Sequence, residues 1–410
     1  MVKNVVMASN PLLQQPTPEW LDQHARELLE FGRASRHRLG FSHLDARGRP
    51  ENQPLELYVT CRMVHSYVIG DQIGVPGSAE LVEHGLFSLD TVFRDYEYGG
   101  WFEAISENGV EDDSKNAYPH SFVILAASSA VIAGFESGQK ILDDALHVFE
   151  ERFWDEAAGR ARESFTRDFS VSEPYRGMNS NMHTVEAFLA AADATGDGVW
   201  RERALRIAEA MVEQAEDEQW RIIEHFDEDW RPLREYNADD KANPFRPYGS
   251  TIGHWFEWAR LLVNLDGGLG EAAPAWLLPA AVGLFDSGVL QGWDVDGAPG
   301  FIYTVDWEGD PVVRLRMHWV VAEAIGAAAA LHHVLEEEQF VDWYRVWWDY
   351  AQKYTIDHQG GSWWHELSPE NQVSTTVWPG KPDIYHALQS LFFARLPVAP
   401  VLVKALMEQN

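Results

Sequence analysis

Long stretches of this chain repeat apolar residues at the spacing of an α-helix, from about Trp20 to about Leu406. Apolar residues three and four positions apart share one face of a helix, so this pattern predicts helices that bury that face. A proline at position 18 opens the first stretch, and a glycine at position 196 follows a later one, as expected at helix ends. The helices we expect include 18–32, 122–133, 182–195 and 319–334.

Short segments rich in aspartate, glycine and aromatic residues separate these helical stretches. Aspartate and glycine favour turn conformations, and the aromatic or β-branched residues beside them suit a short β-hairpin. There are six such segments, and one aspartate from each lies at positions 45, 95, 155, 227, 294 and 357. The intervals are 50, 60, 72, 67 and 63 residues, and each leaves room for two helices.

A repeat of more than 50 residues with two helices in each unit is typical of a closed toroid or a solenoid. Six units match an all-α (α/α)6 barrel, in which six inner helices surround one axis and short β-hairpin loops connect the helices. No proline-, glycine- or serine-rich linker interrupts the pattern. We therefore expect a single domain over residues 1–410.

Composition narrows the possible partners. The chain has 32 basic and 64 acidic residues and a formal net charge of −32, which disfavours nucleic acid and anionic membrane surfaces. Its 18 tryptophans suit a cavity for carbohydrate, because indole faces stack on the C–H faces of sugars. Cys61 is the only cysteine, which excludes an intramolecular disulfide and a thiolate-rich metal site.

Location is also suggested by the sequence. The first fifteen residues have no charged region leading into an apolar core, and no apolar run of membrane-spanning length follows. We expect a cytoplasmic protein. The sequence leaves its oligomeric state open.

Candidate chemistry comes from three pairs of a histidine and a carboxylate three residues apart: His183 with Glu186, His254 with Glu257, and His386 with Asp383. Residues three apart share a helix face, so each carboxylate could orient an imidazole and support its proton affinity. Such pairs suit proton transfer near neutral pH. A histidine settled at a helix–helix contact is the structural alternative for each pair.

Motifs of several other enzyme classes are missing. The chain has no HExxH, no phosphate-binding glycine–lysine loop, no dinucleotide-binding glycine motif after a strand and no GxSxG. The order HxxE also differs from the ExxH of di-metal helical bundles. We therefore expect neither a catalytic metal nor a cofactor.

Five segments together resemble the N-acylglucosamine 2-epimerase superfamily, and they occur along essentially the whole chain. They are Leu57–His65, Asn116–Phe122, Asn179–Glu186, Gly253–Trp258 and Trp378–His386. The last segment, Trp-Pro-Gly-Lys-Pro-Asp-Ile-Tyr-His, resembles the aldose–ketose isomerase branch, which contains bacterial mannose isomerases and sulfoquinovose isomerases. Tyr58 departs from the pattern, since relatives often have tryptophan there.

The resemblance implies an (α/α)6 barrel that interconverts an aldose and the matching ketose through a cis-enediol(ate), without a metal. It also implies roles for individual residues. His254 and His386 would form the acid/base pair, Glu257 would support His254, and His183 would line the pocket. Substrate contacts would come from Arg62, Tyr118, Trp319 and Glu323, with Asp383 beside His386 and Tyr58 stacking on the sugar.

Elementary chemistry agrees with this assignment. Removing a proton from C2 of an open-chain aldose needs a base whose proton affinity lies near the working pH, and imidazole meets that need. The sequence does not decide which histidine acts at carbon and which at oxygen. Arg62 could instead be a buried ion pair between inner helices, Tyr118 and Trp319 could be packing residues, and His183 could line the pocket or transfer protons.

Several alternative functions share these features. A 2-epimerase would reprotonate C2 instead of C1, and a glycoside hydrolase on the same fold would use two carboxylates, for which Asp95, Asp112 and Asp113 are candidates. Among isomerase substrates, the acidic composition favours a neutral monosaccharide. Mannose is preferred, with lyxose as a second aldose. Sulfoquinovose would need an arginine-rich end of the pocket, which Arg246 and Arg176 could supply.

Overall fold

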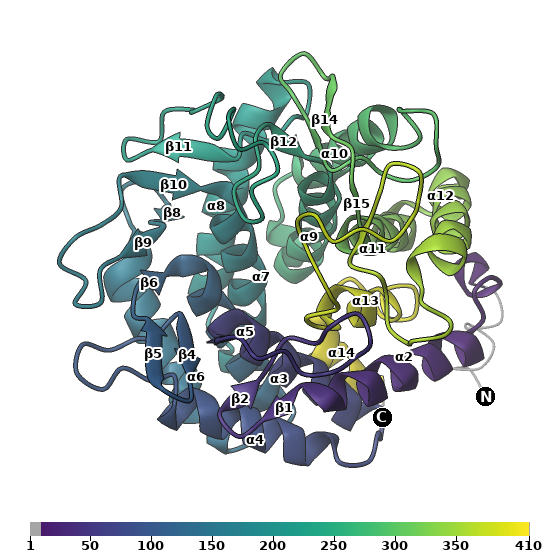
Figure 1. Ribbon diagram of the computed structural model, residues 1–410. Coiled ribbons are helices and arrows are strands. Elements are labelled where there is room, and N and C mark those ends of the chain that lie inside the picture. Colours follow the sequence, from purple (N-terminus) through teal and green to yellow (C-terminus); the bar gives the residue numbers. More distant parts are fainter. Residues whose placement is uncertain (1–9, 410) are drawn as a thin grey trace.

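Helices form a double ring around one axis in the computed structural model, which describes residues 10–409 (Figure 1). The inner helices are α3 (Leu57–Gln72), α5 (Ala117–Ile132), α7 (Met178–Thr195), α9 (Ile252–Leu269), α11 (His318–Leu335) and α13 (Tyr385–Ser390). The outer helices are α2 (Pro18–Gly32), α4 (Ser78–Thr91), α6 (Ser137–Val148), α8 (Val199–Asp217), α10 (Leu277–Gly292) and α12 (Glu338–Tyr350).

The ring of inner helices is closed. Each inner helix contacts the next in chain order, and α13 returns to contact α3. The predicted (α/α)6 barrel is therefore confirmed. The C-terminal helix α14 (Leu402–Gln409) packs against α3 and α5. Residues 1–9 and 410 of the expected single domain lie outside the described residues.

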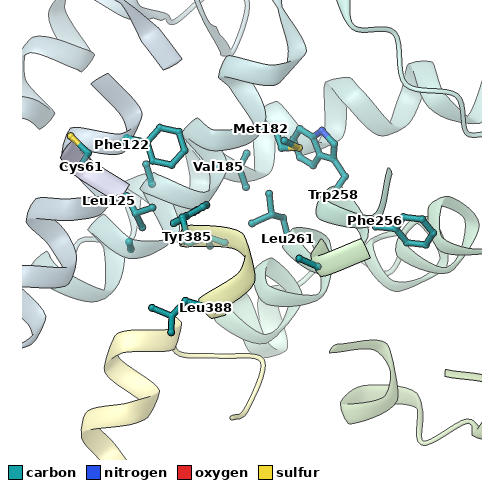
Figure 2. Close-up of a cluster of buried hydrophobic side chains, with 14 of the residues drawn as sticks. Cys61, Phe122, Leu125, Met182, Val185, Phe256, Trp258, Leu261, Tyr385 and Leu388 are labelled. Carbon is teal, nitrogen blue, oxygen red and sulfur yellow. The ribbon is translucent and has the colours of Figure 1, made fainter. Parts of the chain in front are cut away.

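Burial separates the two rings of helices. The inner helices are buried on almost every side, as in α11, where every residue from Val320 to Leu331 is buried. Outer helices bury only one face, which is the amphipathic pattern that the sequence shows most clearly. Figure 2 shows Phe122 of α5, Val185 of α7, Leu261 of α9 and Tyr385 of α13 in one buried hydrophobic cluster.

Short helical turns complete the helical part of the chain. The 3-10 turns are η1 (Pro11–Leu13), η2 (Arg33–Ser35) and η4 (Gly270–Ala272), and π-helical turns η3 (Phe149–Phe153) and η5 (Ala351–Thr355) end α6 and α12. Among the described residues, no helix has both the length and the apolar character needed to cross a bilayer.

Short antiparallel strands lie in the connections between helices. They are β1 (Arg36–His37), β2 (Gly40–Phe41), β3 (Leu55–Glu56), β4 (Ala104–Ser106), β5 (Gly109–Asp112), β6 (Lys115–Asn116), β7 (Trp154–Asp155), β8 (Arg160–Ala161), β9 (Ser164–Phe165), β10 (Tyr175–Gly177), β11 (His225–Asp227), β12 (Ser250–Thr251), β13 (Thr304–Val305), β14 (Pro311–Val313), β15 (Arg316–Met317) and β16 (Glu366–Leu367).

Strand pairing aligns the inner helices. The strand just before an inner helix pairs with a strand of the following repeat, as β3 does with β4, β10 with β11, and β15 with β16. The first amide of each inner helix from α3 to α11 then donates to the carbonyl of one residue of the next repeat. These acceptors are Glu103, Glu163, Glu224, Tyr303 and His365. The amide of Lys381 bonds the carbonyl of Leu44 at 2.8 Å and completes the circle.

All six predicted hairpin segments contain an antiparallel bridge, and in five of them the aspartate shows one of two bonding patterns. In the segments of Asp95, Asp155 and Asp357, the carboxylate accepts amides two and three residues ahead. Asp45 and Asp227 accept amides two and four residues ahead. These two aspartates belong to a second hairpin that lies later in its repeat, which explains part of the uneven spacing of the six aspartates.

Candidate active site

A cavity opens at the N-terminal ends of the inner helices. The strand pairing described above places these ends on one face of the ring. Nine predicted residues line the cavity: Tyr58, Arg62, Tyr118, His183, His254, Glu257, Trp319, Asp383 and His386. Two others, Glu323 and Arg246, are not among the lining residues. Asn179, Tyr303, His318, His365, Phe245 and Trp378 also line it.

His254 lies in the first turn of α9, and its carboxylate partner is Glu224. Nδ1 is 2.9 and 3.0 Å from the two carboxylate oxygens of Glu224, and both side chains are buried. Glu224 also accepts the amide of Thr251 at 3.2 Å. The expected pairing of His254 with Glu257 is wrong, because the side chain from the neighbouring loop reaches Nδ1 instead.

His386 lies in α13, and its partner is Glu323 of α11. Nδ1 donates to Glu323 Oε1 at 2.8 Å. The expected pairing with Asp383 is wrong, because residue 383 precedes the start of α13 and its carboxylate turns to Arg62 at 3.1 Å and to the amide of Tyr385 at 2.9 Å. Burial, followed by the charge of Arg62, holds the pKa of His386 well below its usual value.

His254 and His386 share a chemically useful arrangement. A carboxylate can only accept, so Nδ1 carries the proton in the neutral imidazole and Nε2 is the acceptor. Among the described residues, Nε2 of each ring has no hydrogen-bond partner. The Trp319 ring lies near both, with ring-centroid distances of 5.3 Å to His254 and 5.8 Å to His386. Two basic nitrogens are thus available to one ligand.

His183 is paired as the sequence predicts. Its Nδ1 is 3.3 Å from Glu186 Oε2, and Tyr385 donates to the same oxygen at 2.5 Å. Burial lowers the pKa of His183, although Glu186 opposes this effect. Burial also disfavours ionisation of Glu186, but the bond from His183 and the charge of Arg260 hold its pKa below the usual value.

Arg62 contacts several side chains that form one wall of the cavity. Its guanidinium donates to Asp383 at 3.1 Å and to the Tyr118 hydroxyl at 2.9 Å, and it lies 5.1 Å from the centre of the Tyr58 ring. The tyrosine rings of residues 58 and 118 are 5.8 Å apart. Arg62 is therefore both a buried ion pair and a cavity group, which combines the two readings that the sequence allowed.

Arg246 and Arg176, the two arginines that could have bound the sulfonate of sulfoquinovose, are bonded to other protein groups. Arg246 binds both carboxylate oxygens of Glu173, at 2.8 and 3.0 Å, and stacks on Tyr175. Arg176 donates to the carbonyls of Glu173 and Tyr175. Neither lines the cavity, so among the described residues Arg62 is the one arginine in its wall.

The carboxylates considered for glycoside hydrolysis also lie outside the cavity. Asp95 is bonded to Lys115 at 3.0 Å and to Arg167 at 2.9 Å, and Asp112 and Asp113 are exposed. None of the three lines the cavity. They do not form an acid/base pair beside the histidines.

Glu257 is a buried carboxyl group in the wall of the cavity, and Glu186 and Glu323 lie near it. Glu257 lies 3.7 Å from His183 Nδ1, and among the described residues neither of its oxygens has a hydrogen-bond partner. Burial and the charge of Glu323 raise the pKa of Glu257 well above its usual value. His183, Glu186 and Glu257, and likewise Glu257, Glu323 and His386, lie close enough to surround a cation. The guanidinium of Arg260 contacts a carboxylate of each set, so this side chain already supplies a positive charge there.

A stacked pair of histidines was missed by the sequence analysis. The register of β15 and β16 continues to His318 and His365, whose rings stack with centroids 3.7 Å apart. His365 donates to the carbonyl of Asp383 at 3.2 Å. Burial lowers the pKa of His318 to about 4, so this ring is neutral near pH 7 and can offer one donor and one acceptor.

Glu224 was missed as well. Its place in the repeat is the same as that of Glu103 and Glu163, since each of the three accepts the first amide of an inner helix through its carbonyl. Aligning the repeats on this position could have drawn attention to Glu224, although of the three glutamates only Glu224 contacts a histidine of the cavity.

Comparisons with known proteins show which proteins this chain is similar to. The family model of N-acylglucosamine 2-epimerase matches residues 40–390. A D-mannose isomerase of Thermobifida fusca is 50% identical over 94% of this chain and 96% of its own, and one of Pseudomonas cannabina pv. alisalensis is 46% identical over 95% of each chain. A crystal structure of a D-mannose isomerase is similar with a TM-score of 0.86 at 25% identity, covering 92% of this chain and 97% of its own.

Proposed function

The chain belongs to the N-acylglucosamine 2-epimerase family, and from this premise we propose that it is an aldose–ketose isomerase that interconverts D-mannose and D-fructose. D-lyxose and D-xylulose are a second substrate pair, because lyxose is mannose shortened at C6. Support comes from the two relatives that are named D-mannose isomerases and are similar over almost the whole chain. We assign the activity to one catalytic domain.

One observation supports this chemistry most directly. His254 and His386 both lie next to the Trp319 ring, and each is bonded through Nδ1 to a buried carboxylate. Both therefore offer Nε2 to a molecule in the same cavity. A reaction that moves one proton between carbons and another between oxygens needs two such groups.

The proposed reaction starts from the open-chain aldose. Neutral His386 removes the proton from C2, the electron pair of that bond forms the C1=C2 double bond, and O1 becomes the enediolate oxygen. His254 takes the proton from O2 and delivers it to O1. The charge now on O2 forms the C2 carbonyl, and C1 takes back the proton from His386. All protons and electrons balance, and no oxidant is needed.

Other residues of the cavity have supporting roles in this proposal. Arg62 stabilises the negative charge of the enediolate, and Tyr118 and Asp383 hold Arg62 in place. Tyr58 and Trp319 provide aromatic surfaces for the sugar. His183 and Glu257 bind hydroxyls of the sugar, and a neutral Glu257 can donate.

Two predicted contacts take different roles. Glu323 acts through His386 rather than on the sugar, and Arg246 shapes a loop that borders the cavity. We propose that the reaction needs no metal, because the two imidazoles carry every proton. A neutral monosaccharide is the proposed substrate, since the only arginine among the described lining residues is already paired with Asp383.

A sugar panel followed by NMR tests the proposal. D-mannose, D-lyxose, D-glucose and sulfoquinovose are incubated with the enzyme, and the appearance of ketose is recorded for each. We expect fructose from mannose and xylulose from lyxose. Formation of glucose from mannose with little fructose would identify a 2-epimerase, and turnover of sulfoquinovose alone would show that the sulfonated sugar is the substrate.

A further inference from the structure

Arg260 lies beneath the cavity, on α9, and is 3% exposed. Its Nε donates to Glu323 Oε2 at 2.9 Å. Its Nη2 lies 3.7 Å from Glu257 and 3.9 Å from Glu186, and it has no hydrogen-bond partner among the described residues. One guanidinium therefore faces three carboxyl groups that come from three inner helices.

Two of these carboxyl groups hold cavity histidines. The other oxygen of Glu323 accepts from His386 at 2.8 Å, and Glu186 lies 3.3 Å from His183. A continuous chain of polar contacts thus runs from His386 through Glu323, Arg260 and Glu186 to His183. The two histidines lie on different helices, so Arg260 is the group that connects their supports.

Titratable groups around Arg260 and its three glutamates lie on α3, α7, α9, α11 and α13. They are Arg62 and His65 on α3, His183 and Glu186 on α7, Glu257 on α9, Glu323 on α11, and Tyr385 and His386 on α13. With all three carboxyls ionised, the cluster of Arg260 and its glutamates would carry two excess negative charges in a buried site. Such a site takes up protons unless a cation compensates it.

We propose that Arg260 is a positioning residue that keeps the carboxylate partners of His183 and His386 ionised and aligned, so that both imidazoles stay in the proton state that catalysis needs. This inference rests on the proposed function, which assigns proton transfer to His386. Arg260 itself touches no substrate, because it lies below the lining residues of the cavity.

Removing the positive charge of Arg260 should change the proton affinities around it in one direction. A nearby positive charge disfavours every protonated form around it, so its loss raises the apparent proton affinity of the cluster as a whole. His386 or its partner then binds a proton at a higher pH. The acid limb of kcat/KM should move upward, because the unprotonated base is required on that limb.

The experiment compares R260M and R260Q, which remove the charge, with R260K, which keeps it. We expect the acid limb of mannose isomerisation to move up by about one pH unit or more in both neutral variants. The limb should stay close to that of the wild type in R260K. Two neutral replacements are included so that poor folding of one does not decide the outcome.

R316M is the matched control. Arg316 is also a buried arginine with a carboxylate partner, Asp296, but it does not line the cavity or contact its carboxylates. We expect a lower stability for R316M with an unchanged acid limb. An equal shift in R316M and R260M would show that general loosening causes the effect, and the proposal would be overturned.

A second readout does not depend on mannose as the substrate. The imidazole of His386 is titrated by NMR in enzyme with labelled histidine, without sugar, with H386Q for assignment. Protonation at a higher pH in R260Q than in wild type supports the role of Arg260, and identical titrations overturn it. If wild-type enzyme fails to convert mannose but the titrations differ, the proposed function fails while the role of Arg260 stands.

Discussion

Replacement of Glu224 should impair the reaction although this residue never touches the substrate. Both oxygens of Glu224 lie within 3.0 Å of His254 Nδ1, and no other carboxylate in residues 10–409 bonds this ring. A hydrogen bond to a charged group contributes about 1.5 to 3 kcal/mol. Because about 1.4 kcal/mol corresponds to a factor of ten, E224Q should lose roughly ten- to hundredfold in kcat, with a small change in KM.

The matched control is Glu163→Gln. Glu163 has the same place in the neighbouring repeat and accepts from Ser180 at 2.6 Å, but it meets no cavity histidine. Initial rates of fructose formation are measured for both variants over a range of mannose concentrations, with circular dichroism as the check of folding. E163Q should keep at least about a third of kcat. Equal losses in the two variants, or an E224Q enzyme with more than about half of wild-type kcat, would refute the assignment of Glu224 to His254.

Three further predictions follow from the same geometry. Replacing His254 or His386 by alanine should lower kcat by about 10²- to 10⁴-fold with unchanged helical circular dichroism, and retention of more than about a tenth of the activity by both variants would exclude them as the acid/base pair. Activity should survive prolonged chelation and dialysis, whereas loss with recovery on adding a divalent ion would reveal a metal requirement. Burial lowers the pKa of His65 to about 4, so the folded state disfavours its protonation and stability falls as the pH drops from about 6.5 towards 4, by about 1.4 kcal/mol per pH unit from this group. Urea denaturation of H65Q should show a weaker pH dependence than wild type in that window, and an identical dependence would contradict this reasoning.

Much of the fold could be predicted from the pattern of the sequence. Helix boundaries such as 18–32 agree with α2, and the proline at 18 and the cap at Gly196 mark ends that local chemistry determines. Inner helices begin earlier than predicted, as α5 does at Ala117, because their first turns carry polar residues that face the cavity. The sequence could not show that Asp45 and Asp227 belong to the second hairpin of their repeats, because both hairpins of a repeat use the same turn residues.

Nine of the predicted residues line the cavity, but two of the three predicted histidine–carboxylate pairings are wrong. A spacing of three residues is informative only inside a helix, and it succeeds for His183 and Glu186 in α7. It fails at Asp383, because the backbone of Ile384 is not helical and α13 begins at Tyr385. For His254 it fails because a carboxylate from another repeat lies closer than one on the same helix. Such contacts depend on tertiary packing, which no spacing along one element reveals.

The isomerisation of mannose in heavy water tests the central claim most directly. If His386 moves the proton from C2 to the same face of C1, fructose should carry up to one deuterium at C1, placed stereospecifically. Incorporation below one atom is compatible with internal transfer before exchange with solvent. A 2-epimerase would place deuterium at C2 of glucose, and a hydride shift would leave the ketose unlabelled. Fructose that remains free of C1 deuterium at long times with ample enzyme would contradict the enediol mechanism assigned to His254 and His386.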